Sequence, residues 1–161
     1  MLNYNNAIND EINHNGLIVR EISPVIKLNL RGKKREFFTS IGKNLNMILP
    51  TEANTSSASD KLTSIWLSPD EWMVFSNKKV QENSNEHELE ESLYKNVSKT
   101  NLGAITDVSD QFVLFELEGK NIYELFSSGS PFNFNEFKEK KGSTTQTLLN
   151  HIDVIIHHKN Q

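Results

Sequence analysis

The sequence predicts an α+β protein made of two related halves, each with a strand, a helix and a following β-hairpin. Amphipathic helical segments and β-prone segments mix along the chain in similar measure. A strand–glycine–helix pattern occurs twice, and a two-strand pattern follows each copy. With 161 residues, the chain is long enough to bury a real core as one domain or two small fused halves.

An internal repeat emerges when residues 28–42, LNLRGKKREFFTSIG, are laid over residues 115–129, FELEGKNIYELFSSG. Each copy has a strand, a glycine that frees the turn, and a helix that closes on a second glycine. The matching pairs are Leu30 and Leu117, Gly32 and Gly119, Lys33 and Lys120, Ser40 and Ser127, and Gly42 and Gly129. We therefore expect two related halves, at about residues 16–108 and 109–161.

The first residues differ in composition from the rest. Residues 1–15 are polar and aperiodic, which predicts a disordered tail before a folded domain over residues 16–161. Strands are predicted over 17–22 and 25–31, where β-prone residues partly alternate with polar ones. Residues 33–45 carry apolar side chains at helical spacing, which predicts a helix packed on these strands.

The next segment holds the sharpest local pattern. Residues 51–60 have no large apolar side chain, which predicts an exposed connection. The run SIWLSPDEWMVFS then predicts a β-hairpin, because its central Ser-Pro-Asp is typical of a turn. If Leu67 pairs with Trp72, the indoles of Trp66 and Trp72 lie on opposite faces of the sheet.

The remaining elements follow the same two periodicities. Helices 33–45, 86–99 and 120–127 are expected to cover the sheet faces. The other predicted elements are strands at 104–108, 112–117, 144–149 and 153–158, and an aromatic loop at 132–137.

The last predicted strand, residues 153–158, has no predicted neighbour on its outer side. Its counterpart in the first half is followed at once by a pairing strand, residues 72–75. We therefore expect 153–158 to be an edge strand with apolar surface nearby, in an incomplete second half that a native extension would stabilise.

Composition excludes several classes of function. A formal net charge of −4 provides no positive field for nucleic acid. The absence of cysteine excludes disulfides, thiolate metal sites and thiol nucleophiles, and favours the cytoplasm. No apolar run approaches the ~20 residues of a membrane-spanning helix, and the first residues lack a signal peptide's pattern. Hydrophobic residues are 36%, which indicates a lean core and apolar surface reserved for a partner.

The histidines near the C-terminus form the densest group of candidate metal ligands. His151, His157 and His158 match no strong ligand spacing, and in a strand His157 and His158 point to opposite faces. Ordinary surface or rim histidines are the favoured interpretation.

Two further groups have a chemical and a structural interpretation. Asp107, Ser109 and Asp110 imitate an acid–base pair, but the sequence DVSD between strands favours a turn. No GxSxG motif links a serine to a base, so serine hydrolysis is unsupported. No catalytic, cofactor-binding or metal residue is therefore assigned, and no cofactor is expected in this chain.

Charged and aromatic clusters complete the candidates. The sequence Arg31-Gly32-Lys33-Lys34-Arg35 places four cations at a helix start, where free amides bind anions. Neither a P-loop nor GxGxxG is present, so a solvated charge cluster is favoured. Phe132, Phe134 and Phe137 favour local core over an interface.

Several motifs together resemble the gamma subunit of heterotetrameric sarcosine oxidase. The most specific is WLSPDEW at 66–72, and weaker motifs follow in the family's order. These are LNLRG at 28–32, DVSDQFVLFELEG at 107–119, and SGSPFNF with GSTTQTLLNHIDVIIH at 128–157. The resemblance runs from about residue 19 onward. Family members usually continue past the final strand, so we expect this chain to be a fragment or to have a trimmed last unit.

The resemblance implies a fold like that of folate-binding aminomethyltransferase domains. It implies a non-catalytic structural subunit whose partners are the alpha, beta and delta subunits, which carry the flavins and other cofactors. An independent folate-binding one-carbon transfer domain is the alternative, because the same fold serves both roles. A stand-alone hydrolase or metal enzyme would require a ligand set or triad that the sequence does not supply.

Overall fold

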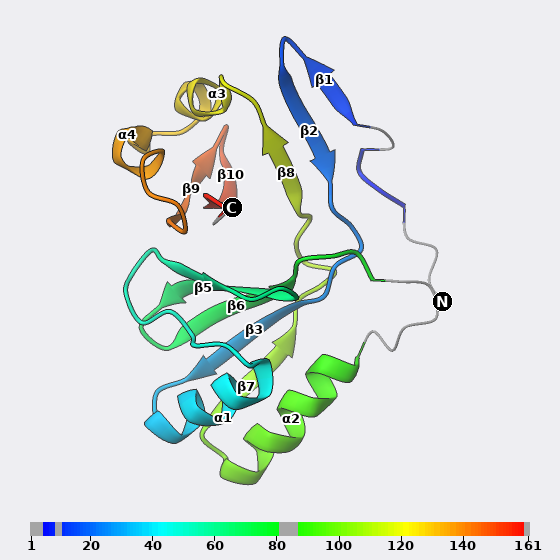
Figure 1. Ribbon diagram of the computed structural model, residues 1–161, viewed down its shortest axis with the longest axis vertical. Coiled ribbons are helices and arrows are strands. Elements are labelled where there is room, and N and C mark those ends of the chain that lie inside the picture. The colour runs from blue at the N-terminus through cyan, green and yellow to red at the C-terminus, as the bar shows by residue number, and fades with distance from the viewer. Residues whose placement is uncertain (1–4, 9–10, 81–86, 160–161) are drawn as a thin grey trace.

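The structure is a computed structural model that describes residues 5–8, 11–80 and 87–159. Its centre is an antiparallel five-stranded sheet in the order β4-β5-β6-β3-β7. Helices α1 (Arg35–Leu45) and α2 (Glu88–Thr100) cover one face of this sheet (Figure 1). The strands are β3 (Lys27–Gly32), β4 (Ser56–Ala58), β5 (Leu62–Ser68), β6 (Glu71–Ser76) and β7 (Gly103–Asp107).

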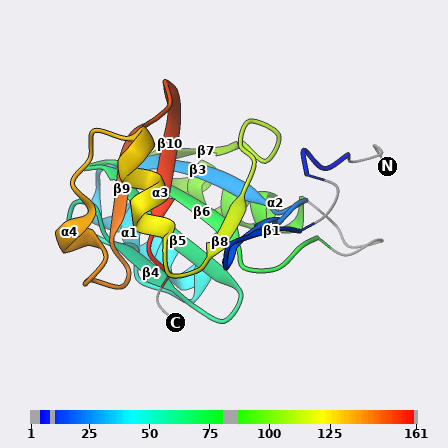
Figure 2. The same ribbon diagram turned by 90° about the horizontal axis from the view of Figure 1, so that it is seen from above.

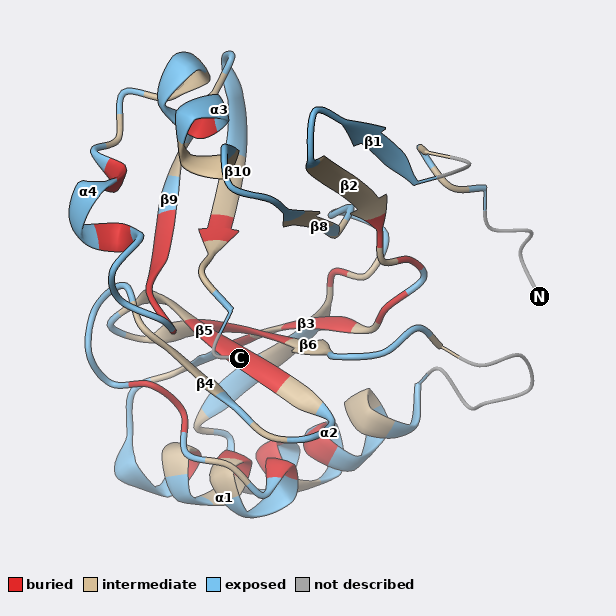
Figure 3. Cartoon of the chain, turned by 45° about the horizontal axis from the view of Figure 1, so that its top comes forward, coloured by how far each residue is buried: buried red, intermediate tan, exposed pale blue. Residues whose placement is uncertain are grey.

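The main core lies between the helices and the five-stranded sheet. Leu28 and Leu30 of β3 are fully buried there because alternate residues of a strand share one face. Figure 3 shows buried residues along the centre of this sheet and on the helix faces turned towards it. The ten buried side chains of this core are Leu28, Leu30, Phe37, Ile41, Leu45, Leu49, Trp72, Val74, Leu93 and Val97. Each contributes about 1.5–3 kcal/mol relative to exposure.

The β5–β6 hairpin differs from the predicted register. Trp66 pairs with Trp72 and Ser68 pairs with Glu71, so Leu67 is the extra residue of a bulge. The predicted pairing of Leu67 with Trp72 is therefore wrong, and both indoles lie on the helix-covered face. The bulge arises because Ser68 and Glu71 close the two-residue turn, which displaces the register by one.

A second hairpin lies on the helix-free face of the five-stranded sheet. It consists of β9 (Thr144–Leu149) and β10 (Ile152–His157), which turn at Asn150 and His151, both with positive φ. Ile155 packs with Ile65, Met73 and Val108 of the sheet below it. Figure 2 shows α3 (Ile122–Gly129) over the other side of this hairpin, and α4 (Phe134–Phe137) lies beside it.

The second hairpin packs against an aromatic cluster. Phe126, Phe134, Phe137 and Ile156 form its buried part. The predicted local-core role of the phenylalanines is confirmed, but residues 132–137 are not entirely a loop. Asn133 accepts the amide hydrogen of Asn135, which caps the short helix α4.

A third sheet has the order β1-β2-β8 and lies beside the second hairpin (Figure 1). Its strands are β1 (Ile12–His14), β2 (Leu17–Glu21) and β8 (Phe115–Glu118). Arg20 binds the carboxylates of Glu11, Glu116 and Glu118 across this sheet. The predicted tail over residues 1–15 is therefore wrong for 12–14. Residues 1–4 and 9–10 of that tail lie outside the described residues.

Two segments differ from their predicted secondary structure. Residues 56–58, within the predicted connection 51–60, form the edge strand β4, because ladder hydrogen bonds require no apolar side chains. The predicted strand 112–117 begins only at Phe115.

Gly32 and Gly119, which match each other in the repeat, are required for different reasons. A Cβ on Gly32 would lie 2.5 Å from the ring of Phe37, so the core needs its missing side chain. Gly119 has a φ of +141°, and a Cβ there would lie 2.3 Å from the carbonyl oxygen of Gly16. The order strand, glycine, helix and hairpin therefore occurs twice, whereas the local packing differs.

The predicted edge strand is confirmed. Among the described strands, β10 pairs only with β9. Ile152 and Leu148 near this edge expose 67% and 43% of their surface, so apolar surface is present as predicted.

Candidate functional site

A groove of about 940 Å³ lies between the five-stranded sheet and the second hairpin. The sheet contributes a row of paired residues, Met73, Asn29 and Thr106, on its helix-free face. The segment after β7 contributes Gln111 and Phe112. From the second hairpin come Gln146, Thr147, Leu148, Asp153, Val154 and Ile155, and the lining is completed by Arg31, Leu67, Glu71, Val108 and Pro131. The groove therefore combines apolar and polar side chains in equal number.

The polar groups of the groove centre on Glu71. Its two carboxylate oxygens accept hydrogen bonds from Asn29 and from Arg31, both at 2.7 Å. The Arg31 guanidinium lowers the pKa of Glu71, and the Asn29 amide adds to this effect. This carboxylate is therefore ionised and occupied by its neighbours, which suits a fixed recognition group better than a proton donor.

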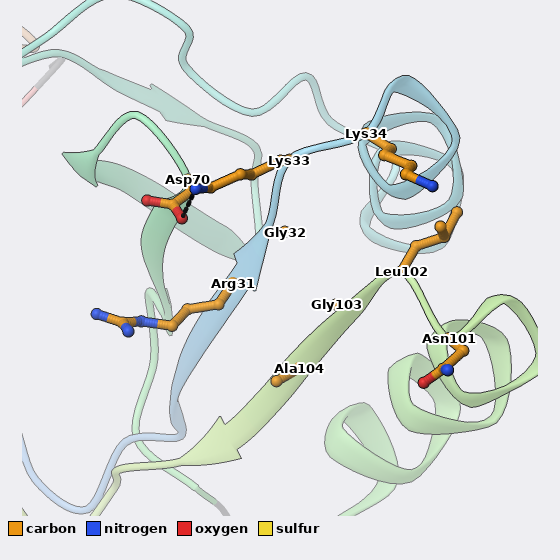
Figure 4. A pocket seen from close by; sticks show the side chains of 9 residues that line it. All are labelled: Arg31, Gly32, Lys33, Lys34, Asp70, Asn101, Leu102, Gly103 and Ala104. Atoms are coloured by element: carbon orange, nitrogen blue, oxygen red, sulfur yellow. Dashed lines mark ion pairs between the residues drawn. The ribbon is translucent and has the colours of Figure 1, made fainter.

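A second, smaller pocket of about 410 Å³ surrounds the start of α1 (Figure 4). It contains Arg31, Lys33 and Lys34 from the predicted cationic cluster. Lys33 lies 3.4 Å from Asp70, and Arg31 extends away from Lys34 towards Glu71. Since carboxylates engage two of these cations at exposed positions, the cluster matches the predicted solvated charge cluster.

The three candidate histidines do not come together. His151 lies exposed in the turn between β9 and β10, while the rings of His157 and His158 point to opposite faces as predicted. His158 stacks on Phe137 in the aromatic cluster.

His157 is half-buried at the end of β10. Its Nε2 lies 2.9 Å from the hydroxyl of Ser56, which donates to the carbonyl oxygen of Gly142. Burial is the main cause that lowers the pKa of His157 to about 4, and the electrostatic effects of His158 and Lys159 contribute to the same shift. The neutral ring thus joins β10 to β4. If Ser56 were a nucleophile, His157 would have to act as its base, and a third group would have to orient the imidazole ring. Among the described residues, no hydrogen bond to the Nδ1 of His157 provides such a group.

The predicted DVSD turn is confirmed, and it holds a buried lysine. Asp107 accepts the amide hydrogen of Ser109 at 2.8 Å. The ammonium group of Lys27 donates to the carbonyl oxygens of Val25 and Ser109, at 3.0 and 2.9 Å. Burial lowers the pKa of Lys27, which acts as a link between β3 and the turn.

One group of ligand-type side chains was not predicted. Ligand atoms of His87, Glu90 and Asp107 lie within 4.8 Å of one another. These are residue types that bind divalent transition metals. His87 exposes 63% of its side chain, and one Asp107 oxygen already serves the turn. His87 and Glu90 lie together at the start of α2, but Asp107 comes from β7, so no contiguous motif marks the group.

A family model described as sarcosine oxidase, gamma subunit family, matches residues 32–161. The chain belongs to the sarcosine oxidase gamma subunit family. This family membership confirms the resemblance carried by the WLSPDEW motif and its neighbours. None of the curated proteins that were compared matches the chain.

A solved structure supports the fold of this gamma-family chain. It is a chain of the heterotetrameric sarcosine oxidase from Corynebacterium sp. U-96, in complex with pyrrole 2-carboxylate. The TM-score is 0.77 at 17% sequence identity, over 94% of this chain and 75% of that chain. The predicted α+β fold is thereby confirmed.

The described part of this gamma-family chain has no helix that is long and apolar enough to cross a membrane. Sequence reasoning identified its turns and charged clusters, but it missed Lys27 and the Ser56–His157 contact. Lys27 alternates with the apolar Ile26 and Leu28, a pattern that predicts a place on the polar face of its strand. In the structure, its ammonium group instead bonds to the carbonyl oxygens of Val25 and of Ser109 in the DVSD turn.

Proposed function

We propose that this chain is a non-catalytic, structural subunit of a heterotetrameric sarcosine oxidase in the cytoplasm. In this proposal, flavin-bearing subunits demethylate sarcosine oxidatively to glycine, and this chain supports their assembly. The observation that carries the proposal is the gamma-subunit family match over residues 32–161. The alpha, beta and delta subunits are the expected partners.

The environment of the candidate residues supports a structural role. His157, Lys27 and Asp107 each hold backbone or hydroxyl groups of neighbouring segments. Glu71 is occupied by Asn29 and Arg31. Exposed apolar residues around the second hairpin provide surface for contact with other chains.

Co-expression with the three partner subunits tests the proposal. With an affinity tag on this chain, we expect purification to recover flavin absorbance and all four subunits. Recovery of the chain alone, with the flavin-bearing subunits in the unbound fraction, would contradict the proposal.

The alternative function, an independent one-carbon transfer domain, would use the groove between sheet and hairpin for a folate. Calorimetric titration of the isolated chain with a reduced folate separates the two functions. The proposed role predicts no saturable heat, whereas stoichiometric binding would favour the alternative.

A further inference from the structure

The outer edge of β10 presents backbone groups that have no partner in the described part of the chain. The amide of His158 donates to the carbonyl oxygen of Ser143. Because successive amides of a strand point to opposite sides, this bond shows which amides of β10 face β9. By this alternation, the amides of Val154 and Ile156 face β9, and those of Asp153 and Ile155 face outward. Such an edge is a template for another extended chain.

The same edge lines the groove between the sheet and the second hairpin. Asp153, Val154 and Ile155 all contribute to its lining. Phe112, which exposes 41% of its surface, and Met73 add apolar side chains. A strand along this edge would therefore place alternate side chains against the apolar lining.

The first half shows what occupies the equivalent position there. Its hairpin strand β6 pairs directly with β3, the strand that opens the repeat. In the second half, the opening strand β8 pairs with β2 and not with β10. Yet β8 lies on the side of β10 away from β9 (Figures 1 and 3), and Leu117 packs into the cluster that contains Ile156. In the first half, the opening strand of the repeat therefore pairs with the hairpin, whereas in the second half the equivalent position beside β10 has no paired strand among the described residues.

We infer that an extended segment of a partner subunit adds to β10 as a strand and occupies this groove. The inference rests on the proposed function and names the surface through which it operates. Backbone hydrogen bonds to Asp153 and Ile155 would provide the main recognition. The carboxylate of Asp153 forms no ion pair with the described residues, and a basic side chain on the segment would be complementary to it.

Hydrogen–deuterium exchange at single-residue resolution tests the inference, with the isolated chain compared to the complex co-expressed with the alpha, beta and delta subunits. We expect the amides of Asp153 and Ile155 to exchange at least tenfold more slowly in the complex. Val154 and Ile156 are internal controls, because their amides already bond to β9 and are expected to be slow in both samples.

A proline substitution provides the second arm. Asp153→Pro removes an outward amide at an edge position that tolerates proline, while Asp153→Ala removes only the carboxylate. We expect D153P to weaken binding to the partner subunits at least tenfold, with a smaller loss for D153A. The melting temperatures of the isolated variants check that both fold.

The outcomes separate this inference from the proposed function. A flavin-containing complex in which Asp153 and Ile155 remain unprotected, or which D153P joins with unchanged affinity, overturns the inference alone. Failure to form any complex overturns both. Protection that develops in the isolated chain at high concentration, with dimerisation, overturns the inference in favour of a second copy.

Discussion

The two units of the repeat have the same order of elements but very different cores. In the first unit, β3 joins its hairpin in one sheet, and side chains such as Leu30 and Phe37 are completely buried. In the second, β8 pairs elsewhere, and the buried apolar side chains, Phe134, Phe137, Phe126 and Ile156, retain between 3% and 9% exposure. A shared local pattern therefore specifies elements, whereas packing decides whether they join into one sheet. The first unit forms the stable core, and the second presents surface.

The largest expected effect is on the two cores. Phe37→Ala should reduce the free energy of unfolding by about 3–5 kcal/mol, because the ring is fully buried against Trp72. Phe126→Ala should cost less, about 2–3 kcal/mol, because its site is partly open and can relax. Urea unfolding of both variants measures the difference. Equal losses, or a larger loss for F126A, would refute the asymmetry between the units.

The contact between Ser56 and His157, which links the two units, should be sensitive to pH. The folded-state pKa of His157, about 4, lies below the ordinary value of 6.5, so the folded chain favours the neutral ring. This stabilisation is present above pH 6.5 and is lost as the pH falls towards 4, by up to about 3 kcal/mol. Unfolding measured between pH 7.5 and 4 should show a shallower loss for His157→Gln. Identical slopes for both proteins would rule out His157 as the origin.

A smaller effect is expected at the glycine that opens the first unit. Gly32→Ala should cost about 2 kcal/mol, because the added Cβ meets the ring of Phe37. Phe37→Leu in the same chain should recover about 1 kcal/mol of the loss, in a double-mutant cycle measured by urea unfolding. Gly16→Ala provides the contrast, because its φ of +77° strains an alanine while no atom lies within 4 Å of the added Cβ, whereas Gly32 has no positive φ and meets only the ring. Purely additive losses for Gly32 and Phe37 would show that the ring is not the obstacle.

The smallest effect concerns buried hydroxyls in both units. Ser64 of β5 and Thr144 of β9 have buried hydroxyl oxygens without a hydrogen-bond partner among the described residues. Ser64→Ala and Thr144→Val should raise the free energy of unfolding by up to about 1 kcal/mol each. Ser109→Ala is the matched control and should destabilise, because it removes the hydrogen bond from the Lys27 amide. A loss of stability in S64A and T144V, measured by thermal unfolding, would contradict the prediction that these buried hydroxyls destabilise the fold.

The sequence was most informative where the signal is local. The periodicity of residues 33–45 located α1 to within two residues, and Asp107 and Ser109 formed the expected turn. The register of the first hairpin was wrong because a bulge at Leu67 depends on turn closure and leaves no mark in the alternation. Likewise, β1 and β4 contain few apolar residues, and only pairing with distant partners makes them strands.

The candidate site was harder to predict than the fold. The groove joins residues from β3, β6, β7 and the second hairpin, so no contiguous motif encodes it. The contact between Ser56 and His157 spans 101 positions of sequence. The family, by contrast, was accessible from the sequence, because WLSPDEW combines a turn with two indoles in a fixed order.

Native mass spectrometry of the co-expressed assembly tests the central claim most directly, because it counts subunits without requiring activity. The account predicts a species that contains one copy of this chain together with the alpha, beta and delta subunits and their flavins. Dissociation of that species should release the chain at its own mass of 18.4 kDa. Detection of the chain only as a free species, beside an assembly of the other subunits that lacks it, would contradict the claim.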